Sequence, residues 1–412
     1  MPITRRNFLQ SASITFANMI LPAWMPRLSF APQQTAPRGD LLVCIFLRGA
    51  ADALNIVAPC GENEYYNLRP TLAIPRPDDA RAQRDLRARD LDGFFGLHPS
   101  LNALLPAWQD KQLGFVHACG APDESRSHFQ AMALMERGVE NEVGPASGWI
   151  GRHLASLDNG NRSPLRAIGF GERVPRSLLG AIPATALRSI ADFHLGGDAR
   201  AVAQMQALLA ALYTDADPLS NVSRETLEVL RTLERLDPAR YNARYPQSDL
   251  GLGLRQVALL VKAEVGLEVA CLDVGGWDTH IAQGGSAGLM AKLLRDLGDG
   301  LAAFYADMRE QIRQIAVITL SEFGRRAHEN GGLGTDHGHG GVMMLMGGGV
   351  VGGRVHGAWP GLADGQLIGP GDLAVTTDYR DVLGEIVQKR LRNDKLSEVF
   401  PNYTPKFRGV IR

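Results

Sequence analysis

Continuous apolar runs recur along the chain and predict buried strands. They occupy residues 41–47, 113–119, 165–170, 267–273 and 315–320, and a shorter run at 343–346 precedes the glycine-rich stretch 347–353. A strand that is apolar at every position, rather than at alternate ones, is typical of a parallel sheet that is covered on both faces. We therefore expect these runs to form one sheet.

Segments with the spacing of amphipathic helices separate these strands. They cover residues 101–108, 129–137, 199–213, 224–235, 254–265, 289–309 and 380–390. Strands that alternate with helices over this length predict an α/β fold built on a doubly wound, mostly parallel sheet. Residues 199–265 contain no convincing strand, so we expect a helical insertion there, packed on the sheet. Residues 40–412 then form a single α/β domain.

Composition narrows the class of protein. The chain has 412 residues, of which 45% are hydrophobic, and its formal net charge is -1. This apolar share excludes a disordered chain, and the balanced charge argues against binding to nucleic acid, which needs an excess of basic residues. No apolar run after residue 30 reaches the length of a membrane span. These properties are typical of a large globular enzyme.

The four cysteines are expected to be buried thiols. Cys44, Cys119 and Cys271 lie within predicted strands, and Cys60 lies in a loop. No pair has the spacing of a metal site. An oxidising compartment would allow a disulfide, but the strand positions favour free, buried side chains.

The first residues resemble a twin-arginine export signal. Arg5 and Arg6 precede Phe8 and Leu9, and a modest apolar stretch follows from residue 12 to residue 24. Such signals direct a folded protein out of the cytoplasm through the twin-arginine translocase. We expect residues 1–39 to be a signal and linker, with the translocase as a partner. The mature protein is then periplasmic or otherwise exported.

Chemically active residues follow the predicted strands, where open α/β sheets bind their ligands. Five segments bring such residues to one expected edge of the sheet. In chain order they contain Arg48 and Asp52; Ser127 and His128; Asp278 and His280; Glu322 and Arg325; and Asp336, His337 and His339. Each residue taken singly also has a structural explanation, such as a turn or a helix cap, so the functional interpretation depends on the agreement among the five segments.

Carboxylates and imidazoles without thiolates indicate an open metal site rather than a closed structural zinc site. These donors suit Zn²⁺, or alternatively Mn²⁺ or Mg²⁺. Glycines around Asp336 and His339 let the backbone fold tightly, so that neighbouring side chains can converge on one centre. The sequence therefore predicts a site for divalent metal ions at this edge.

The role of Ser127 stays open between two interpretations. In the structural interpretation, its hydroxyl caps the start of a helix. In the functional one, the helix N-terminus stabilises negative charge and so lowers the free-energy cost of forming an alkoxide. Near metal ions Ser127 is a candidate nucleophile on phosphorus or sulfur, with Ser125 and then Ser321 as competitors. The candidates to hold the oxygens of such a substrate are Arg48, Arg126 and Arg325.

Longer motifs carry a family resemblance. They are residues 48–55 (RGAADALN), 95–99 (FGLHP), 127–129 (SHF), 276–280 (GWDTH), 321–325 (SEFGR), 334–340 (GTDHGHG) and 376–380 (TTDYR). Together they resemble a large exported bacterial family of unknown function, the domain-of-unknown-function family 1501, over nearly the whole mature chain. That family is in turn similar to the alkaline phosphatase and sulfatase superfamily, so the resemblance implies an alkaline-phosphatase-like sheet.

The superfamily pattern, carried onto this chain, implies two metal ions. One would be held by Asp52, Asp336 and His337 with Ser127 bridging, and the other by Asp278, His280 and a third imidazole, His339 in preference to His128. Two departures weaken the transfer. The first Asp and His pair in the later part of the chain, Asp278 and His280, is closer together than in alkaline phosphatases. The sulfatase motif Cys/Ser-x-Pro-x-Arg is absent, which argues against a formylglycine sulfatase.

These observations favour an exported metal-dependent hydrolase of phosphate, phosphodiester or sulfate esters. Ser127 or a metal-bound hydroxide would attack a small-molecule or glycan ester, and Glu322 would be a supporting base or a further ligand. The alternative is a non-catalytic periplasmic protein that keeps the fold for binding or as a scaffold. A redox enzyme is disfavoured, because no G-x-G-x-x-G follows the first strand and the cysteines form no cluster.

Overall fold

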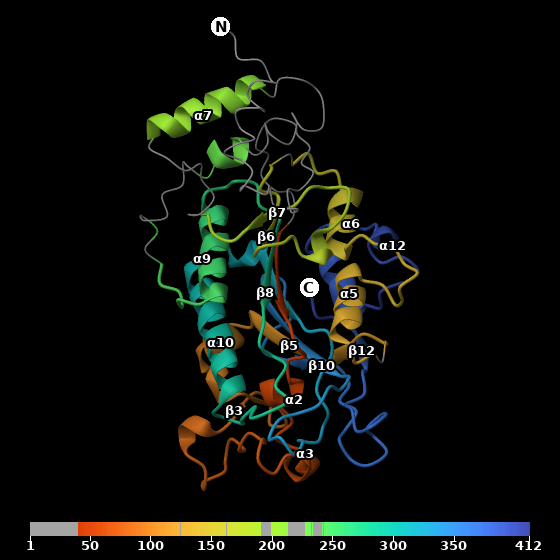
Figure 1. Ribbon diagram of the computed structural model, residues 1–412. Coiled ribbons are helices and arrows are strands. Elements are labelled where there is room, and N and C mark those ends of the chain that lie inside the picture. The colour runs from red at the N-terminus through yellow and green to blue at the C-terminus, as the bar shows by residue number, and fades with distance from the viewer. Residues whose placement is uncertain are drawn as a thin grey trace.

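A central sheet organises the part of the chain that the computed structural model describes, residues 40–123, 125–161, 163–190, 199–212, 227–231, 233, 241 and 243–412 (Figure 1). Within these residues the sheet has nine strands. In spatial order they are β11 (Val355–His356), β5 (Leu113–Gly120), β10 (Gly341–Gly347), β9 (Ile315–Leu320), β1 (Leu41–Leu47), β8 (Val269–Val274), β6 (Ala167–Phe170) and β7 (Thr185–Leu187), with β12 (Thr377–Asp378) also paired to β5. The predicted α/β class with a mostly parallel sheet is confirmed.

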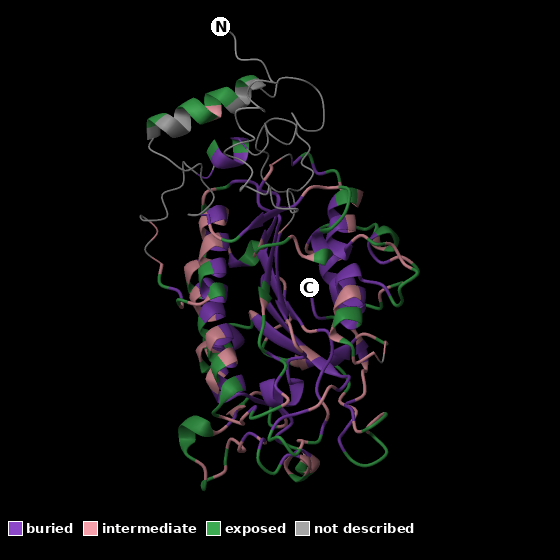
Figure 2. Cartoon of the chain, viewed as in Figure 1, coloured by how far each residue is buried: buried purple, intermediate pink, exposed green. Residues whose placement is uncertain are grey.

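Helices cover both faces of this sheet (Figure 1). One layer contains α5 (His128–Arg137), α6 (Trp149–Ser156), α11 (Tyr379–Lys389) and α12 (Leu396–Val399), and the other contains α9 (Asp249–Lys262), α10 (Leu289–Asp307), η3 (Pro99–Leu104) and α4 (Leu105–Gln109). Leu42 and Phe46 of β1 pack toward the first layer, whereas Val43 and Ile45 pack toward the second. The strand is therefore buried on both faces, as its continuous apolar run predicts (Figure 2).

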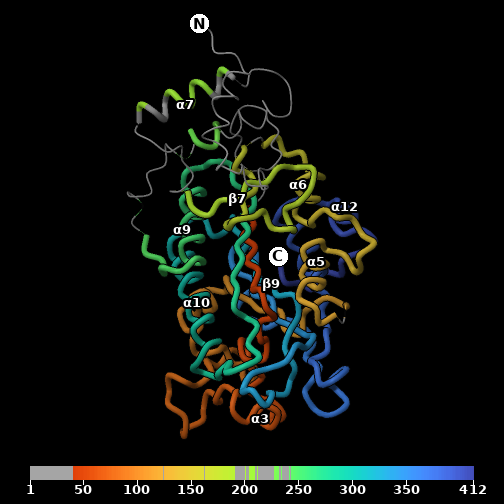
Figure 3. The backbone as a smooth tube through the Cα atoms, viewed as in Figure 1, coloured from red at the N-terminus to blue at the C-terminus, as the bar shows by residue number. Residues whose placement is uncertain are grey.

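Short elements surround these layers. At the end of the sheet where β1 finishes lie α2 (Ala53–Ile56), α3 (Asn63–Leu68) and a small sheet of β2 (Val57–Ala58), β4 (Gly96–Leu97) and β3 (Arg89–Asp90), at the lower end of Figures 1 and 3. The others are α7 (Ala199–Leu212) and the 3-10 helices η2 (Arg84–Leu86), η4 (Arg176–Leu178) and η6 (Ile312–Gln314).

Two predictions reach beyond the described residues. The export signal, residues 1–39, lies wholly outside them. The expected insertion at 199–265 is described only in part, as α7, a helical stretch at 227–231, and α9, which packs on β8 and α10. The insertion therefore stays a prediction.

Two other expectations concern cysteines and membrane spans. All four cysteines are free and buried, as predicted. Across the residues that the structure describes, every helix is too short or too polar to span a bilayer.

The direction of β10 decides where residues 334–341 lie. This strand runs antiparallel to both of its neighbours, β5 and β9, whereas β1, β5, β8 and β9 all run the same way. A segment that precedes a parallel strand would lie at the opposite edge of the sheet. Because β10 is reversed, it begins where the other four strands end, and residues 334–341 reach the edge predicted for the site.

Two glycines let the chain pack closely at this edge. Gly324 donates its N–H to the carbonyl of His339 over 2.9 Å, and Gly338 donates to the carbonyl of Gly324 over the same distance. A Cβ atom on Gly324 would lie 1.9 Å from the carbonyl oxygen of Gly340. At these positions the loop after β9 and the segment before β10 are therefore in direct backbone contact.

Replacing Gly324 by alanine tests this close contact. The added methyl group would force the segment before β10 away from its place, so we expect Gly324→Ala to lower the free energy of unfolding by about 1–3 kcal/mol. Gly331 is the matched control, because a Cβ there meets no atom within 4 Å. Urea denaturation measures both variants, and equal stability for the two would contradict the account.

Candidate metal centre

Three histidines surround one carboxylate oxygen at this edge of the sheet. Oδ1 of Asp278 lies 3.1 Å from Nε2 of His280, 3.2 Å from Nε2 of His337 and 3.5 Å from Nε2 of His128. The Nε2 atoms of His280 and His337 are 2.9 Å apart. Ligand atoms of His128, Asp278 and His337 all lie within 4.8 Å of one another. Imidazole nitrogens and a carboxylate oxygen at these separations are a donor set that Zn²⁺ accepts.

Three segments deliver these side chains because of where their strands end or begin. His128 is the first residue of α5, which follows β5. Asp278 and His280 lie in the loop after β8, and His337 pairs with Arg325 in the bridge before β10. The loop after β1 can approach because it has a glycine, Gly49 (φ 117°), where a Cβ would lie 2.6 Å from the backbone nitrogen of Asp278.

The other ring nitrogen of each histidine is held by an acceptor. Nδ1 of His128 lies 2.7 Å from Oε1 of Glu322, and Nδ1 of His280 lies 3.2 Å from Oδ1 of Asp336. Nδ1 of His337 lies 3.0 Å from the backbone carbonyl of Arg126. We assign a proton to each Nδ1, since all three neighbours are acceptors. The Nε2 lone pairs then face the region of Asp278, which is the arrangement of metal-ligating histidines.

Two features of this arrangement fit a bound cation. With Nδ1 protonated, the Nε2 lone pairs of His280 and His337 face each other at 2.9 Å, and only a shared cation or proton makes that contact favourable. Nε2 of His128 is buried and has no hydrogen-bond partner among the described residues. Buried polar atoms almost always have a partner. A cation held by His128, His337 and Asp278 would give Nε2 of His128 a partner, and a cation shared by His280 and His337 would remove the repulsion between their lone pairs.

The charge states of the centre also suit metal binding. Partial burial opposes ionisation of Asp278, but the hydrogen bond and positive charge of Arg325 outweigh it, and the pKa of Asp278 is lowered to about 2. A hydrogen bond from Asn330 lowers the pKa of Asp336. Burial lowers the pKa of His337. At neutral pH the site therefore offers an ionised carboxylate and a neutral imidazole, the forms that bind metals.

Glu322 is a buried carboxylate with three bonds. Its Oε1 accepts from the N–H of Gly49 at 2.8 Å as well as from His128, and its Oε2 accepts from the hydroxyl of Ser321 at 3.3 Å. Since these groups use its oxygens, Glu322 orients His128 and does not face the centre. The sequence left Glu322 open between a supporting base and a further ligand, and this position is that of a residue that supports His128.

The predicted substrate-binding arginines are bonded to the protein itself. Arg48 pairs with Asp273 at 2.8 Å and with Glu136 at 3.2 Å, and Arg126 pairs with the buried Asp372. Arg325 is buried, and its guanidinium bonds to one carboxylate and four carbonyls. These partners are Asp278 and the backbone oxygens of Gly49, Ala50, Trp277 and Thr335. In this structure the three arginines join different segments of the chain to one another.

Two predicted ligands, Asp52 and His339, are not in the group of facing ligand atoms. Both oxygens of the buried Asp52 bond to Arg69, at 2.6 and 3.0 Å, and one also accepts from Gln283 at 2.6 Å. His339 is buried outside the group of facing ligand atoms. The structure brings His128, the alternative imidazole, to the centre instead. Asp336 supports His280 through Nδ1.

The candidate nucleophiles differ in their surroundings. Ser127 is exposed at the N-cap of α5, next to His128, and its hydroxyl does not cap the helix. The hydroxyl of Ser125 donates to Gln130 over 3.0 Å. The single hydroxyl hydrogen of Ser321 is shared between the carbonyl of Leu47 at 2.8 Å and Oε2 of Glu322 at 3.3 Å, and the oxygen accepts from the backbone N–H of Ala51. Within the part of the chain that the structure describes, Ser127 is the one of the three whose hydroxyl has no such bond.

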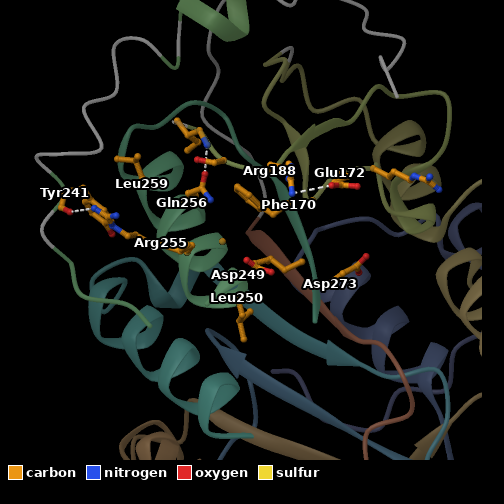
Figure 4. Close-up of a pocket in the computed structure, with 17 residues that line it drawn as sticks. Phe170, Glu172, Arg188, Tyr241, Asp249, Leu250, Arg255, Gln256, Leu259 and Asp273 are labelled. Atoms are coloured by element: carbon orange, nitrogen blue, oxygen red, sulfur yellow. Dashed lines mark hydrogen bonds and ion pairs between the residues drawn. The ribbon is translucent and has the colours of Figure 1, made fainter. Parts of the chain in front are cut away.

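A cavity of about 660 Å³ lies away from the centre, between α9 and the end of β6 (Figure 4). Phe170, Arg188, Tyr241 and Gln256 are among its lining residues, and an ion pair joins Arg188 to Glu172 at 3.3 Å. His128, Asp278 and His337 are not among the residues that line this cavity. By contrast, the side chain of Asp278 is 48% exposed, so the centre is open to solvent at the surface.

The fold and site define an α/β protein with a histidine–carboxylate centre at the carboxyl edge of its sheet. The chain belongs to the family of proteins of unknown function DUF1501, whose model matches residues 40–394. The predicted family resemblance is therefore confirmed. No curated protein matches the chain.

Two solved structures are weakly similar to this chain. The C-terminal periplasmic domain of EptC from Escherichia coli, in complex with zinc, has 8% identity and a TM-score of 0.33 over 78% of this chain and 76% of that one. The integral membrane protein lipooligosaccharide phosphoethanolamine transferase A (EptA) from Neisseria meningitidis has 11% identity and a TM-score of 0.26 over 84% of this chain and 57% of that one.

The variant Glu322→Gln tests whether Glu322 orients His128. A glutamine still accepts the Gly49 N–H but presents a neutral oxygen, or an N–H, to the ring. We expect zinc affinity to fall about 10- to 100-fold, the range found when such supporting carboxylates are changed. Competition with a chelator measures the affinity, and thermal unfolding of the metal-free variant controls for its fold. An unchanged affinity would contradict the assigned role.

Proposed function

We propose that this chain is an exported, metal-dependent hydrolase of phosphate, phosphodiester or sulfate esters. The observation that carries the proposal is the set of three imidazoles turned by their Nδ1 partners toward the ionised Asp278. Such a centre at the carboxyl edge of an α/β sheet lies where these folds bind substrates. The open surface around Asp278 leaves room for an ester to approach.

Zinc is the metal that the donor set favours. Imidazole nitrogens with one carboxylate suit Zn²⁺ better than Mg²⁺ or Mn²⁺, which prefer oxygen. A zinc ion bound there would supply Lewis acidity toward a phosphoryl or sulfuryl oxygen. We propose one ion, held by His128, His280, His337 and Asp278. The second ion implied by the superfamily pattern would need Asp52 or His339, which have other surroundings.

Ser127 is the proposed nucleophile. Its exposed hydroxyl precedes His128 at the N-terminus of α5, where unpaired backbone N–H groups and the helix dipole stabilise negative charge. The serine oxygen would form a bond to phosphorus or sulfur as the ester bond to the alcohol breaks, and the serine proton would pass to the departing alcohol oxygen. Water would then cleave the seryl ester, which releases phosphate or sulfate and restores the serine hydroxyl. Glu322 contributes by fixing the ring of His128, and Arg325 by fixing Asp278.

Location and substrate remain part of the proposal. Residues 1–39 resemble a twin-arginine signal, so we place the mature protein in the periplasm, exported by the twin-arginine translocase after folding. Its substrate is proposed to be a small-molecule or glycan ester.

One observation favours the alternative of a non-catalytic binding or scaffold protein. Arg48, Arg126 and Arg325 are all engaged by protein carboxylates, so these three guanidinium groups are not free to hold substrate oxygens. In that case the metal would be structural. The two functions differ in whether the metal-loaded protein turns over an ester.

Metal analysis of the purified mature protein is the first test. We expect about one equivalent of zinc, and loss of it in the double variant Asp278→Ala/His337→Ala. The variant Asp364→Ala, which changes an exposed carboxylate away from the centre, should bind zinc normally. Absence of metal from a well-folded protein, even after addition of zinc, would contradict the proposal, and two equivalents would restore the two-ion prediction.

Ester hydrolysis by the zinc-loaded protein is the second test. We expect Ser127→Ala to remove nearly all turnover of the phosphate or sulfate ester that the protein accepts, with zinc content unchanged. Ser125→Ala is the matched control and should keep most activity, because that hydroxyl is bonded to Gln130. Equal activity of Ser127→Ala and the unchanged protein would exclude Ser127 as the nucleophile, and no turnover by any zinc-loaded form would favour the scaffold.

A further inference from the structure

Large apolar side chains stand exposed directly beside the metal centre. Phe129, which follows His128, is 87% exposed, and Ile281, which follows His280, is 74% exposed. Among the described residues, only Val143 exceeds them as an exposed large apolar side chain. Leu333, in the loop that leads to Asp336, is 55% exposed. Single exposed apolar residues are common, but a group of them beside a polar site marks a binding surface.

Ile281 and Leu333 belong to one surface, here named the Ile281–Leu333 patch. The backbone N–H of Ala282 donates to the carbonyl of Gly332 over 2.9 Å, and that of Gln283 donates to the carbonyl of Leu333 over 3.0 Å. A Cβ on Gly332 would lie 3.5 Å from Cγ1 of Ile281, so this side chain lies over the neighbouring loop. The two apolar residues therefore lie on adjoining segments.

The backbone of Leu333 is strained as well as exposed. Its φ is 57°, in the left-handed region that a bulky side chain rarely adopts. Asparagine or glycine at this position would relieve the strain. Because Leu333 is exposed, burial of its side chain does not offset the cost in stability. A residue that costs stability without contributing to the core is a candidate for function.

The Ile281–Leu333 patch and Ser127 lie at opposite ends of the row of imidazoles. The ring centres of His128 and His337 are 4.3 Å apart, and those of His337 and His280 are 4.5 Å apart. Ser127 adjoins His128 at one end, and Ile281 adjoins His280 at the other. In transfer of a phosphoryl group, the attacking oxygen and the leaving oxygen lie roughly in line. An attack from Ser127 therefore directs the departing alcohol toward the patch.

We propose that the centre selects esters whose alcohol is apolar, an alkyl or aryl group that packs on the Ile281–Leu333 patch. This inference rests on the proposed function, and it adds the class of substrate. The phosphoryl or sulfuryl group lies at the metal centre, and the alcohol covers Ile281 and Leu333. Phe129 lies on the side of the nucleophile and does not contact the alcohol.

Binding of alkylphosphonates to the zinc-loaded protein tests this selection without requiring turnover. Methyl-, butyl- and octylphosphonate present the same charged group with increasing apolar length, and calorimetry measures their affinities. We expect affinity to rise about two- to fourfold for each methylene that reaches the patch. In Ile281→Ser/Leu333→Asn most of this rise should disappear, while methylphosphonate binds as before. Phe129→Ser is the matched control and should keep the rise.

The variant is chosen so that loss of folding does not explain its effect. Asparagine tolerates the left-handed conformation at position 333, and Ile281 is largely exposed, so we expect the double variant to be as stable as the unchanged protein. Its zinc content and thermal unfolding are measured alongside.

Each other outcome overturns a defined part of the account. Equal affinity for short and long phosphonates would exclude apolar selection and leave the metal-dependent hydrolase standing. Loss of the rise in Phe129→Ser, and not in Ile281→Ser/Leu333→Asn, would exclude the placement on the patch. A change of oligomeric state in the double variant, with the rise kept, would make the patch a contact between copies of the chain. Failure of every phosphonate to bind the zinc-loaded protein would overturn the proposed function for phosphate esters.

Discussion

The buried guanidinium of Arg325 joins four of the segments that meet at the candidate centre, but not the one after β5 that carries His128. It follows β9 and bonds to backbone oxygens in the loops after β1 and β8 and before β10, as well as to Asp278. Burying a charge costs several kcal/mol, and only a full set of hydrogen bonds offsets that cost. If one of these loops moved away, the guanidinium would lose a partner that no water replaces. The same contact keeps Asp278 ionised and fixed, so the loop arrangement and the chemistry of the site depend on one side chain.

Around this fixed carboxylate the histidines differ in origin but share one arrangement. His128, His280 and His337 come from three segments, and each has an acceptor at Nδ1, namely a buried glutamate, a half-exposed aspartate and a backbone carbonyl. Fixing Nδ1 sets both the proton position and the ring orientation, so little reorganisation is needed when a cation binds. Exposed apolar residues lie beside this centre, and we propose that they contact the substrate.

The strands and the edge of the sheet could be predicted from the sequence because continuous apolar runs depend only on local burial. The partners of each charged residue could not. Asp52 follows the first strand as a ligand would, yet Arg69 takes both of its oxygens, and a contact of that kind depends on how distant loops fold together. The choice between His128 and His339 as a ligand could not be predicted either, because the spacing of the two histidines along the chain does not show which one lies near Asp278. The antiparallel direction of β10 could not be predicted from the sequence either, although this direction brings His337 to the site.

The central claim is that one metal ion lies among three inward-facing Nε2 atoms. Anomalous diffraction at the zinc absorption edge, from crystals of the zinc-loaded protein, locates the ion directly. The account predicts one peak about 2.0–2.2 Å from Nε2 of His128, His280 and His337 and from a carboxylate oxygen of Asp278. A peak beside Asp52 or His339, coordination through Nδ1, or no peak in zinc-soaked crystals would contradict it.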